Sequence, residues 1–498
     1  MTKKVLIAGW GQTTQGKEQT ENLVDTLGLM ADASRIAAEN AGSPDILTKL
    51  DGVMAVRPLS SQYPSLAKQL SEKIGANPKF TLVSRIGGNS PQSLVNKAAG
   101  MIARGELESV LIAGGETYYS RDKKNILKGS ALFKGLAGIH KREDMIGSLD
   151  VETRHGVSLP VHGFPLYETA LWAESGMEIS SYLEEIGKRW SEFSNIAAKH
   201  PNAWTNIPRS PDEIINADST NRLIAFPYTK FMNPLLSVDL GAAIILISDE
   251  KAGQFRRKEG QNVYFLGGAY AEDRQQFLIQ KSNFTSSHSL KSAAQKALRR
   301  SKLSLAGIDC FDFYSCFPCS VSIACKMLGI MKSDSRPLTL TGGLGFFGGP
   351  GNNYSLHAIA TLAEAISHGV YNNGMVTSLG WFMHKHAAGI YGAYPQDTQL
   401  EYHDLDDEKN FLVGDEPVKT VEEVSGQGKI ETYTIIYSKD GTSAYAVIYG
   451  KTNEGFRFIA QTHQDPDIFR ALSTQNQVGK QVHLKYDADK KLNIAELV

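Results

Sequence analysis

The sequence predicts an α/β protein that consists of two similar halves followed by a small β-rich module. A glycine-rich loop that leads into an amphipathic helix and then an apolar strand occurs twice, at residues 85–116 and 342–381. A helix followed by a strand precedes each loop, at residues 21–55 and 288–314. Self-similarity over such a long period implies a duplicated α/β unit. The last 80 or so residues differ, because short alternating apolar runs separated by turns are typical of β-strands.

Composition excludes several classes of protein. The 498 residues are enough for two or three domains, and 42% hydrophobic with 21% charged residues is typical of a folded soluble chain. A formal net charge of −1 argues against nucleic-acid binding. No apolar run approaches the roughly 18 residues of a membrane span, and the short N-terminal apolar run predicts a first strand instead of a signal peptide. The four cysteines cluster at residues 310–325, which is unlike a disulfide scaffold, so we expect a cytoplasmic location.

The first half spans residues 1–250. We expect a strand at residues 5–8, a helix at 21–40, and a strand after the Asp51-Gly52 turn. A loop with a double glycine then leads into a helix that ends at Gly105, followed by a strand at 110–113 and a closing strand at 244–248. An insertion at about 118–228, with a helix near 179–200, is too long for a loop and predicts a lid or ligand-covering subdomain.

The second half spans residues 251–398 and contains the most glycine-rich stretch of the chain. Six glycines fall within residues 342–353, directly before a helix that Asn352 or Asn353 can cap and Gly369 can end. A glycine loop before a helix N-terminus brings backbone N–H groups and a positive dipole end close to a ligand. Because the arrangement is duplicated, we expect the two loops to face each other across a pocket.

An acidic linker at residues 399–418 precedes the C-terminal module at 419–498. Asp440-Gly441 between two alternating runs predicts a hairpin, and a short helix and a last strand at 481–489 complete a small barrel of OB type. We expect a separate module, so that truncation near Glu408 leaves a soluble core.

Several motifs resemble the thiolase superfamily: VLIAGGE, VDLGAAIILIS and GGLGFFGGPGNN. The order YSCFP, TGGLGFFGGPGNNY, LGWFMHKHAAGIYG and then an extra β module is most similar to thiolase-like proteins of type 1. The resemblance covers about residues 3–395. It implies a thiolase fold, with duplicated βαβαβαββ halves in a five-layered αβαβα core. It also implies a coenzyme A thioester as substrate or ligand, with no other cofactor, and it makes a homodimer possible.

The resemblance fails at the catalytic positions. Gly88 stands where thiolases carry the nucleophilic cysteine, and Gly349 replaces the histidine of the Gly-His-Pro motif. Of the residues nearest to the missing nucleophile, Asn89 cannot attack a thioester, and Ser90 is more readily explained as a turn or capping residue. The predicted substrate pocket consists of Gly88, Asn89, Ser90, Gly348, Gly349 and Asn352.

Cys316, His384 and His386 are the remaining catalytic candidates. The YSCFP segment resembles the His-Asp-Cys-Phe segment of sterol-carrier-protein thiolases, and Cys316 matches the cysteine of that segment. Cys316 precedes a helix, which can lower the pKa of a thiol. In a strand, His384 and His386 would project from one face. Two imidazoles do not make a metal site, and the other three cysteines, at 310, 319 and 325, are expected to be small buried fillers.

Two hypotheses of different class follow. The chain is an acyltransferase similar to acetyl-CoA acetyltransferases, acting in lipid metabolism, in which Cys316 is a relocated nucleophile and His386 or His384 its base. Alternatively, it is a catalytically inactive module that binds acyl-CoA, with the C-terminal module recruiting a protein partner. Lyase chemistry that needs only an oxyanion hole and a base is a variant of the first hypothesis.

Overall fold

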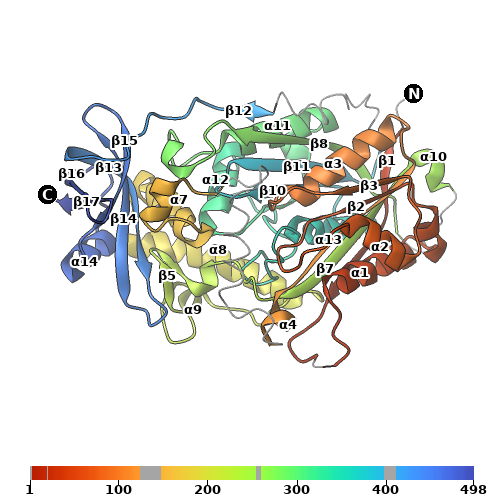
Figure 1. Cartoon of the computed structure of the whole chain (residues 1–498). Helices are drawn as coiled ribbons and strands as arrows, with labels where there is room; N and C mark the ends of the chain where they lie inside the picture. Colours follow the sequence, from red (N-terminus) through yellow and green to blue (C-terminus); the bar gives the residue numbers. More distant parts are fainter. Residues whose placement is uncertain (1–2, 20, 124–146, 254–259, 397–410) are drawn as a thin grey trace.

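The computed structural model describes residues 3–19, 21–123, 147–253, 260–396 and 411–498. Its main feature is a ten-stranded sheet in which two sets of strands meet at β1 and β8 (Figure 1). The first set has the order β3-β2-β4-β7-β1 and the second the order β8-β11-β10-β9. The strands are β1 (Val5–Thr14), β2 (Gly52–Ala55), β3 (Phe80–Val83), β4 (Ser109–Thr117), β7 (Asp239–Ser248), β8 (Tyr264–Asp273), β9 (Cys310–Asp312), β10 (Asn373–Gly380), β11 (Lys385–Gly392) and β12 (Leu412–Val413).

The two sets pair in the same way, which confirms the predicted duplication. β2 is parallel to β4 as β9 is parallel to β10. β4 is antiparallel to β7 as β10 is to β11, and β7 is antiparallel to β1 as β11 is to β8. Each strand of the first half therefore has a counterpart in the second half with the same pairing partners and directions.

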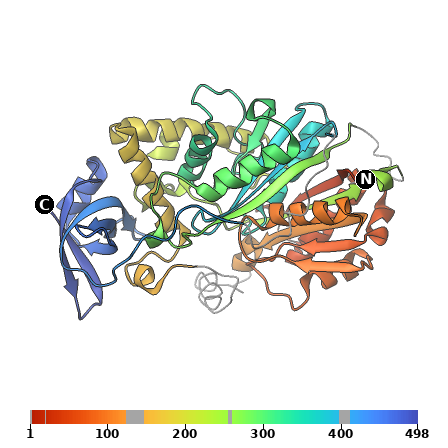
Figure 2. The same cartoon turned by 90° about the horizontal axis from the view of Figure 1, so that it is seen from above.

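Helices form the other layers of the predicted αβαβα core. Alternate side chains of the first-half strands pack on opposite faces: Leu111 with helices α1 and α2, and Ile112 with helices α3 and α13. The strands of the second half lie on the other side of α3 and α13, and α11 covers their outer face with α12 packed beside it (Figure 2). These helices are α1 (Thr26–Asn40), α2 (Leu66–Ile74), α3 (Ser90–Ala103), α11 (His288–Ser301), α12 (Pro318–Leu328) and α13 (Tyr354–Ser367).

Several boundaries differ from the prediction. α1 begins at Thr26 instead of residue 21, because the Asp25 carboxylate accepts the Gly28 N–H and caps the helix there. α13 ends before Gly369, which is left-handed at φ 73° as expected. The side chain of its N-cap residue, Asn353, makes no capping hydrogen bond.

The insertion folds into helices that lie against the second half. Its helix α8 confirms the one predicted near residues 179–200. Residues 124–146 of the insertion are outside the described residues. The elements of the insertion are α4 (Tyr118–Lys123), α6 (Asp150–Arg154), α7 (Pro160–Ser175), α8 (Ile179–Lys199), α9 (Pro211–Ile215), β5 (Leu223–Ala225) and β6 (Tyr228–Thr229). Single-turn elements elsewhere are α10 (Asp249–Ala252), η1 (Pro44–Lys49), η2 (Lys230–Met232), η3 (Leu278–Gln280) and η4 (Leu305–Gly307).

The C-terminal strands close into a five-stranded barrel, as predicted. The pairing runs from β13 through β14, β15, β17 and β16 back to β13. The prediction missed the last strand, β17, which follows β16 through a tight turn. The barrel elements are β13 (Gly426–Tyr437), β14 (Ser443–Thr452), β15 (Arg457–Thr462), α14 (Pro466–Thr474), β16 (Gln481–Asp487) and β17 (Leu492–Leu497).

The barrel forms extensive contacts with the rest of the chain. β13 pairs with β5 of the insertion, and barrel side chains belong to the same hydrophobic cluster as α7, α11 and α12. The predicted acidic linker lies mostly outside the described residues. Its described end is also not simply solvated, because β12 pairs in parallel with β8. Among the described helices, none has the length and apolar character needed to cross a membrane.

Candidate functional site

The two glycine loops lie against each other at the N-termini of α3 and α13. The Asn352 side chain bridges them, because its Oδ1 accepts the Gly87 N–H at 3.0 Å and its Nδ2 donates to the Arg57 carbonyl at 2.8 Å. Ser355, in the first turn of α13, donates to the Gly88 carbonyl at 3.3 Å. Of the predicted pocket residues, the structure therefore brings Asn352 of the second loop next to the first loop, beside Gly88.

At Gly88, the space that a nucleophile's side chain needs is already filled. A Cβ atom at this position would lie 2.2 Å from the Tyr314 hydroxyl oxygen and 2.5 Å from the Leu379 carbonyl oxygen. Real Cβ atoms essentially never come that close to another atom. Tyr314 is buried, and its ring packs edge-on against Tyr354 with centroids 5.5 Å apart. A phenol thus occupies the position of the missing thiol.

The position of the missing histidine is different. A Cβ at Gly349 would meet Pro234 Cβ at 3.3 Å and Leu235 O at 3.5 Å, which is close to ordinary contact. Its neighbour Gly348 has φ 124°, a conformation that favours glycine, and a Cβ there would lie 2.8 Å from Leu240 Cδ1. A Cβ at Gly349 would therefore need only a small shift of its neighbours, unlike a Cβ at Gly88.

Asn89 and Ser90 have no nucleophilic geometry. The Ser90 hydroxyl donates to the Arg85 carbonyl at 2.7 Å, so Ser90 acts as a turn residue at the start of α3. The Asn89 side chain lies against Gly380 of β10, where a Cβ would be 2.2 Å from Asn89 Oδ1. Asn89 Oδ1 is buried and has no hydrogen-bond partner among the described residues.

Cys316 lies just before α12, as the sequence indicates, but its environment does not activate a thiol. Burial raises the pKa of Cys316 to about 12, although the Ser320 hydroxyl, 3.8 Å from the sulfur, acts in the opposite direction. This is the reverse of the low pKa expected from a helix N-terminus. Across the described residues, no hydrogen bond joins Cys316 to His384 or His386. All four cysteines are free, and burial raises the pKa of each of the other three.

His384 and His386 are both buried, and they do not share a strand. β11 begins at Lys385, and His384 belongs to the preceding turn, so the strand alternation on which their shared face was predicted does not include His384. Burial lowers the pKa of His386 to about 4 and that of His384 well below its usual value, so both rings are neutral. Neither ring has a hydrogen bond of good geometry to the described residues. These residues also hold no group of three side chains suited to a metal ion.

Sequence reasoning missed a network behind Tyr314. The buried carboxylate of Asp312 accepts hydrogen bonds from the Tyr354 hydroxyl at 3.0 Å and from the backbone N–H groups of Leu340 and Thr341. The Tyr354 and Thr341 hydroxyls are 2.6 Å apart. Tyr354 directly follows the second loop, but no local pattern in the sequence marks it as a neighbour of Tyr314.

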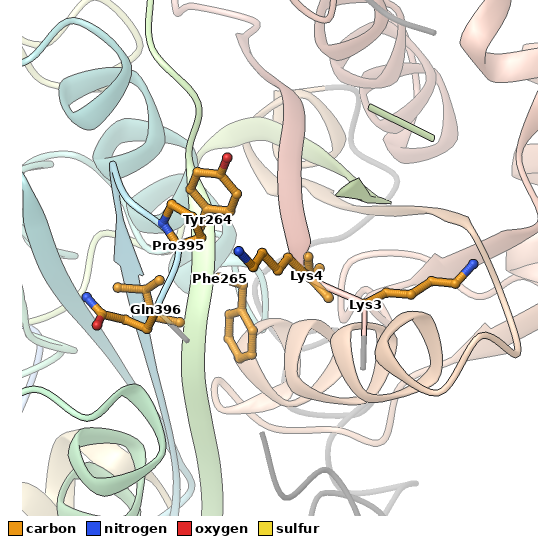
Figure 3. Close-up of a pocket in the computed structure, with 8 residues that line it drawn as sticks. Lys3, Lys4, Tyr264, Phe265, Pro395 and Gln396 are labelled. Atoms are coloured by element: carbon orange, nitrogen blue, oxygen red, sulfur yellow. The ribbon is translucent and has the colours of Figure 1, made fainter. Parts of the chain in front are cut away.

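One surface pocket lies elsewhere, where β1 meets β8 (Figure 3). It contains no predicted site residue, and we assign it no role. Its lining residues are Lys3, Lys4, Val5, Tyr264, Phe265, Leu266, Pro395 and Gln396.

Comparisons with known proteins agree with this architecture. The family model of the thiolase-like protein type 1 additional C-terminal domain matches residues 410–489. A crystal structure of a monomeric SCP2-thiolase like protein type 1 from Mycobacterium smegmatis is similar with a TM-score of 0.82, at 29% identity over 99% of each chain. No curated protein matches the chain.

Two more distant structures share the fold. An Ltp2-ChsH2(DUF35) aldolase matches with a TM-score of 0.61 and 19% identity, over 79% of this chain and 98% of that one. Acetyl-CoA acetyltransferase from Syntrophomonas wolfei matches with a TM-score of 0.57 and 15% identity, over 79% and 100%. Together with the barrel and the duplicated sheet, these matches give the chain the thiolase fold and support membership of the thiolase-like proteins of type 1, whose additional C-terminal domain matches residues 410–489.

Proposed function

We propose that this protein binds acyl-CoA thioesters at the two glycine loops without forming an acyl-enzyme. The observation that carries the proposal is the position of the Tyr314 hydroxyl, in the space that a nucleophilic side chain at residue 88 would need. A phenol there can donate a hydrogen bond to a thioester oxygen. It cannot replace a thiolate as nucleophile, because burial raises the pKa of Tyr314 above its ordinary value and keeps the phenol protonated.

Buried polar atoms without partners support a polar ligand at this place. Such atoms cost free energy unless something bonds to them. Within the described residues, several of them belong to the loops and the β10–β11 hairpin: Asn89 Oδ1, both amide atoms of Asn353, Trp381 Nε1 and the ring nitrogens of His384 and His386.

Acyl transfer through Cys316 with His386 or His384 as base is the competing function. The raised pKa of the Cys316 thiol argues against it, since the thiolate is the attacking species. The neutral imidazoles remain compatible with a base. Their position in the hairpin beside Gly88 keeps them as catalytic candidates for chemistry that needs no cysteine.

A lyase reaction is the second candidate that an observation favours. The Tyr314 hydroxyl lies beside Gly88, where the side chain of a nucleophile would begin, and a protonated phenol there can act as a general acid toward a thioester bound at this loop. The Ltp2-ChsH2(DUF35) neighbour is an aldolase, although its 19% identity establishes only a shared fold. In a retro-aldol cleavage, a 3-hydroxyacyl-CoA would give acetyl-CoA and a carbonyl compound.

The proposal also covers the oligomeric state of the protein, a protein partner and the cellular setting. The Mycobacterium smegmatis structure is that of a monomer, which supports a monomer here over the homodimer considered from the sequence. The Ltp2 neighbour is in complex with ChsH2(DUF35), which supports a search for a protein partner. A cytoplasmic location and a role in lipid metabolism are the settings that free cysteines and a thioester ligand would suit.

Intact-mass measurement and calorimetry separate these functions. The wild-type protein and the Cys316→Ala and Tyr314→Phe variants are each incubated with acetyl-CoA, longer acyl-CoAs and 3-hydroxyacyl-CoAs. We expect saturable binding without a covalent adduct, and weaker binding by Tyr314→Phe. An acyl adduct that Cys316→Ala abolishes would overturn the proposal in favour of acyl transfer. Release of acetyl-CoA that Tyr314→Phe abolishes would establish the lyase.

A further inference from the structure

The turn between β10 and β11 adopts a backbone conformation that its residues do not favour. Trp381 and Met383 have φ values of 55° and 61°, in the left-handed region that side chains with a Cβ rarely enter. Neither residue is a glycine, an asparagine or an aspartate, which tolerate this region best. Such a turn persists only where its surroundings hold it, and turns of this kind gather at functional sites.

The turn directly follows the part of β10 that contacts the first glycine loop. The Leu379 carbonyl faces Gly88, and Gly380 lies against the Asn89 side chain. Leu379 also pairs with His386 in the sheet. A shift of this hairpin would therefore move the wall of the proposed thioester site.

Helix α7 of the insertion holds the turn in place. The Tyr167 hydroxyl, which is buried, donates to the Phe382 carbonyl at 2.7 Å. The Phe382 ring packs so closely on α7 that a Cβ at Gly163 would lie 2.5 Å from Phe382 Cε1. On the other side of the turn, the Asp273 N–H donates to the His384 carbonyl at 2.8 Å.

The C-terminal barrel in turn holds α7. Thr432 on β13 is buried and donates a hydrogen bond to the Leu166 carbonyl, one residue before Tyr167. The barrel also contacts α6, the helix before α7, because Tyr449 donates to the Glu152 carboxylate at 3.2 Å. Figure 1 shows α7 between the barrel strands and the second half of the sheet.

We propose that the C-terminal barrel positions the β10–β11 hairpin of the thioester site through α7, with Thr432 and Tyr167 as positioning residues. The barrel is then a structural part of the site and not only a surface for recruiting a partner. The effect on ligand affinity rests on the proposed function, whereas the effect on the hairpin does not.

Hydrogen exchange followed by mass spectrometry tests the proposal on the full-length chain. Thr432→Val removes the hydroxyl at nearly constant volume, and Tyr167→Phe removes only the bond to Phe382. Thr434→Val is the matched control, because Thr434 is also buried on β13 and donates to an insertion carbonyl, that of Phe226, at 2.9 Å. Phe226 precedes β6, and its ring contacts α7 at Trp172, more than one helical turn beyond Tyr167.

We expect faster exchange in peptides covering residues 379–387 for Thr432→Val and Tyr167→Phe, by between about twofold and about tenfold, the range that one net hydrogen bond supports. Thr434→Val should leave these peptides unchanged. Equal exchange in Thr432→Val and Thr434→Val would overturn the role of the barrel, and an unchanged hairpin in Tyr167→Phe would overturn the role of α7. Calorimetry with acyl-CoA on the same variants is a separate readout. A loosened hairpin in a protein that binds no acyl-CoA would refute the proposed function and leave this inference standing.

Discussion

Replacing Gly88 by alanine should destabilise the fold strongly, whereas the same replacement at Gly349 should not. Each glycine stands where a thiolase is expected to carry a catalytic side chain. If both side chains had simply been lost, the space for a new side chain should be similar at the two positions. The structure predicts a large difference, because a new Cβ at Gly88 would lie 2.2 Å from the Tyr314 hydroxyl and 2.5 Å from the Leu379 carbonyl. At Gly349 the nearest atom is Pro234 Cβ at 3.3 Å.

The magnitude follows from what can move. The Leu379 carbonyl belongs to β10, and Leu379 is paired with His386 of β11, so the carbonyl cannot retreat without distorting this pairing. Tyr314 is buried and packed against Tyr354. Overpacking of this kind costs about 1–3 kcal/mol, and we expect the upper end for Gly88→Ala. For Gly349→Ala we expect the free energy of unfolding to change by no more than about 0.5 kcal/mol, because Pro234 needs to move away from the new Cβ by only a few tenths of an ångström.

Thermal and urea denaturation of the two variants measure this difference. Because a chain of this size need not unfold in two states, the midpoints are compared directly. Adding Tyr314→Ala to Gly88→Ala should recover part of the loss but not all of it, since the Leu379 carbonyl remains. Equal midpoints for Gly88→Ala and Gly349→Ala would refute the idea that Tyr314 has filled the nucleophile's place.

Three further predictions concern the thiol, a buried carboxyl and the barrel. With its pKa raised to about 12, the Cys316 thiol at pH 8 is ionised in only about one molecule in ten thousand, so iodoacetamide should label it far more slowly than in unfolded protein; equal rates would contradict this. Burial raises the pKa of Glu152 from 4.5 to about 7, so the folded state keeps a proton that the unfolded chain loses, and stability falls as the pH rises through this window. The melting temperature of Glu152→Gln relative to wild type should therefore increase between pH 5 and pH 8, by the equivalent of at most about 3 kcal/mol; a constant difference would exclude a raised pKa. A chain that ends at residue 418 should aggregate in size-exclusion chromatography, because α7 loses its apolar contacts with β13; a monodisperse truncated core would contradict the integral packing.

The duplicated core was predictable because its signals are local. A double glycine before a helix, and the apolar strand after it, are visible within about thirty residues, and the same order recurs in the second half. Counting along the family motifs predicts that Gly88 and Gly349 stand at the nucleophile and base positions. Strand ends were less predictable, because β1 and β7 continue through small and polar residues that pairing alone holds extended.

The site's remaining features depend on contacts between distant segments. The sequence around His384 alternates as a strand would, but the left-handed Trp381 and Met383 make it a turn that α7 holds through Tyr167. Local propensity opposes that conformation, so no local pattern predicts it. The expectation of a low pKa for Cys316 was wrong for a related reason. The helix N-terminus lowers the pKa of a nearby thiol, but burial by other segments raises it by more.

The hydrogen-bond network behind Tyr314 distinguishes two explanations of the site. Either Tyr314 only fills the space of a missing catalytic thiol, or it is positioned to bind a ligand. Filling the space left by a lost thiol needs nothing more than an apolar side chain, and a buried carboxylate nearby costs free energy that such a filler would avoid. Here Asp312 is buried, and burial raises its pKa even though backbone N–H groups and the Tyr354 hydroxyl bond to it. The same network fixes Tyr354 edge-on against Tyr314, which limits the rotation of the phenol at Gly88. A phenol held this firmly at the reacting position has the properties of a preorganised hydrogen-bond donor, which is what recognition of a thioester oxygen requires.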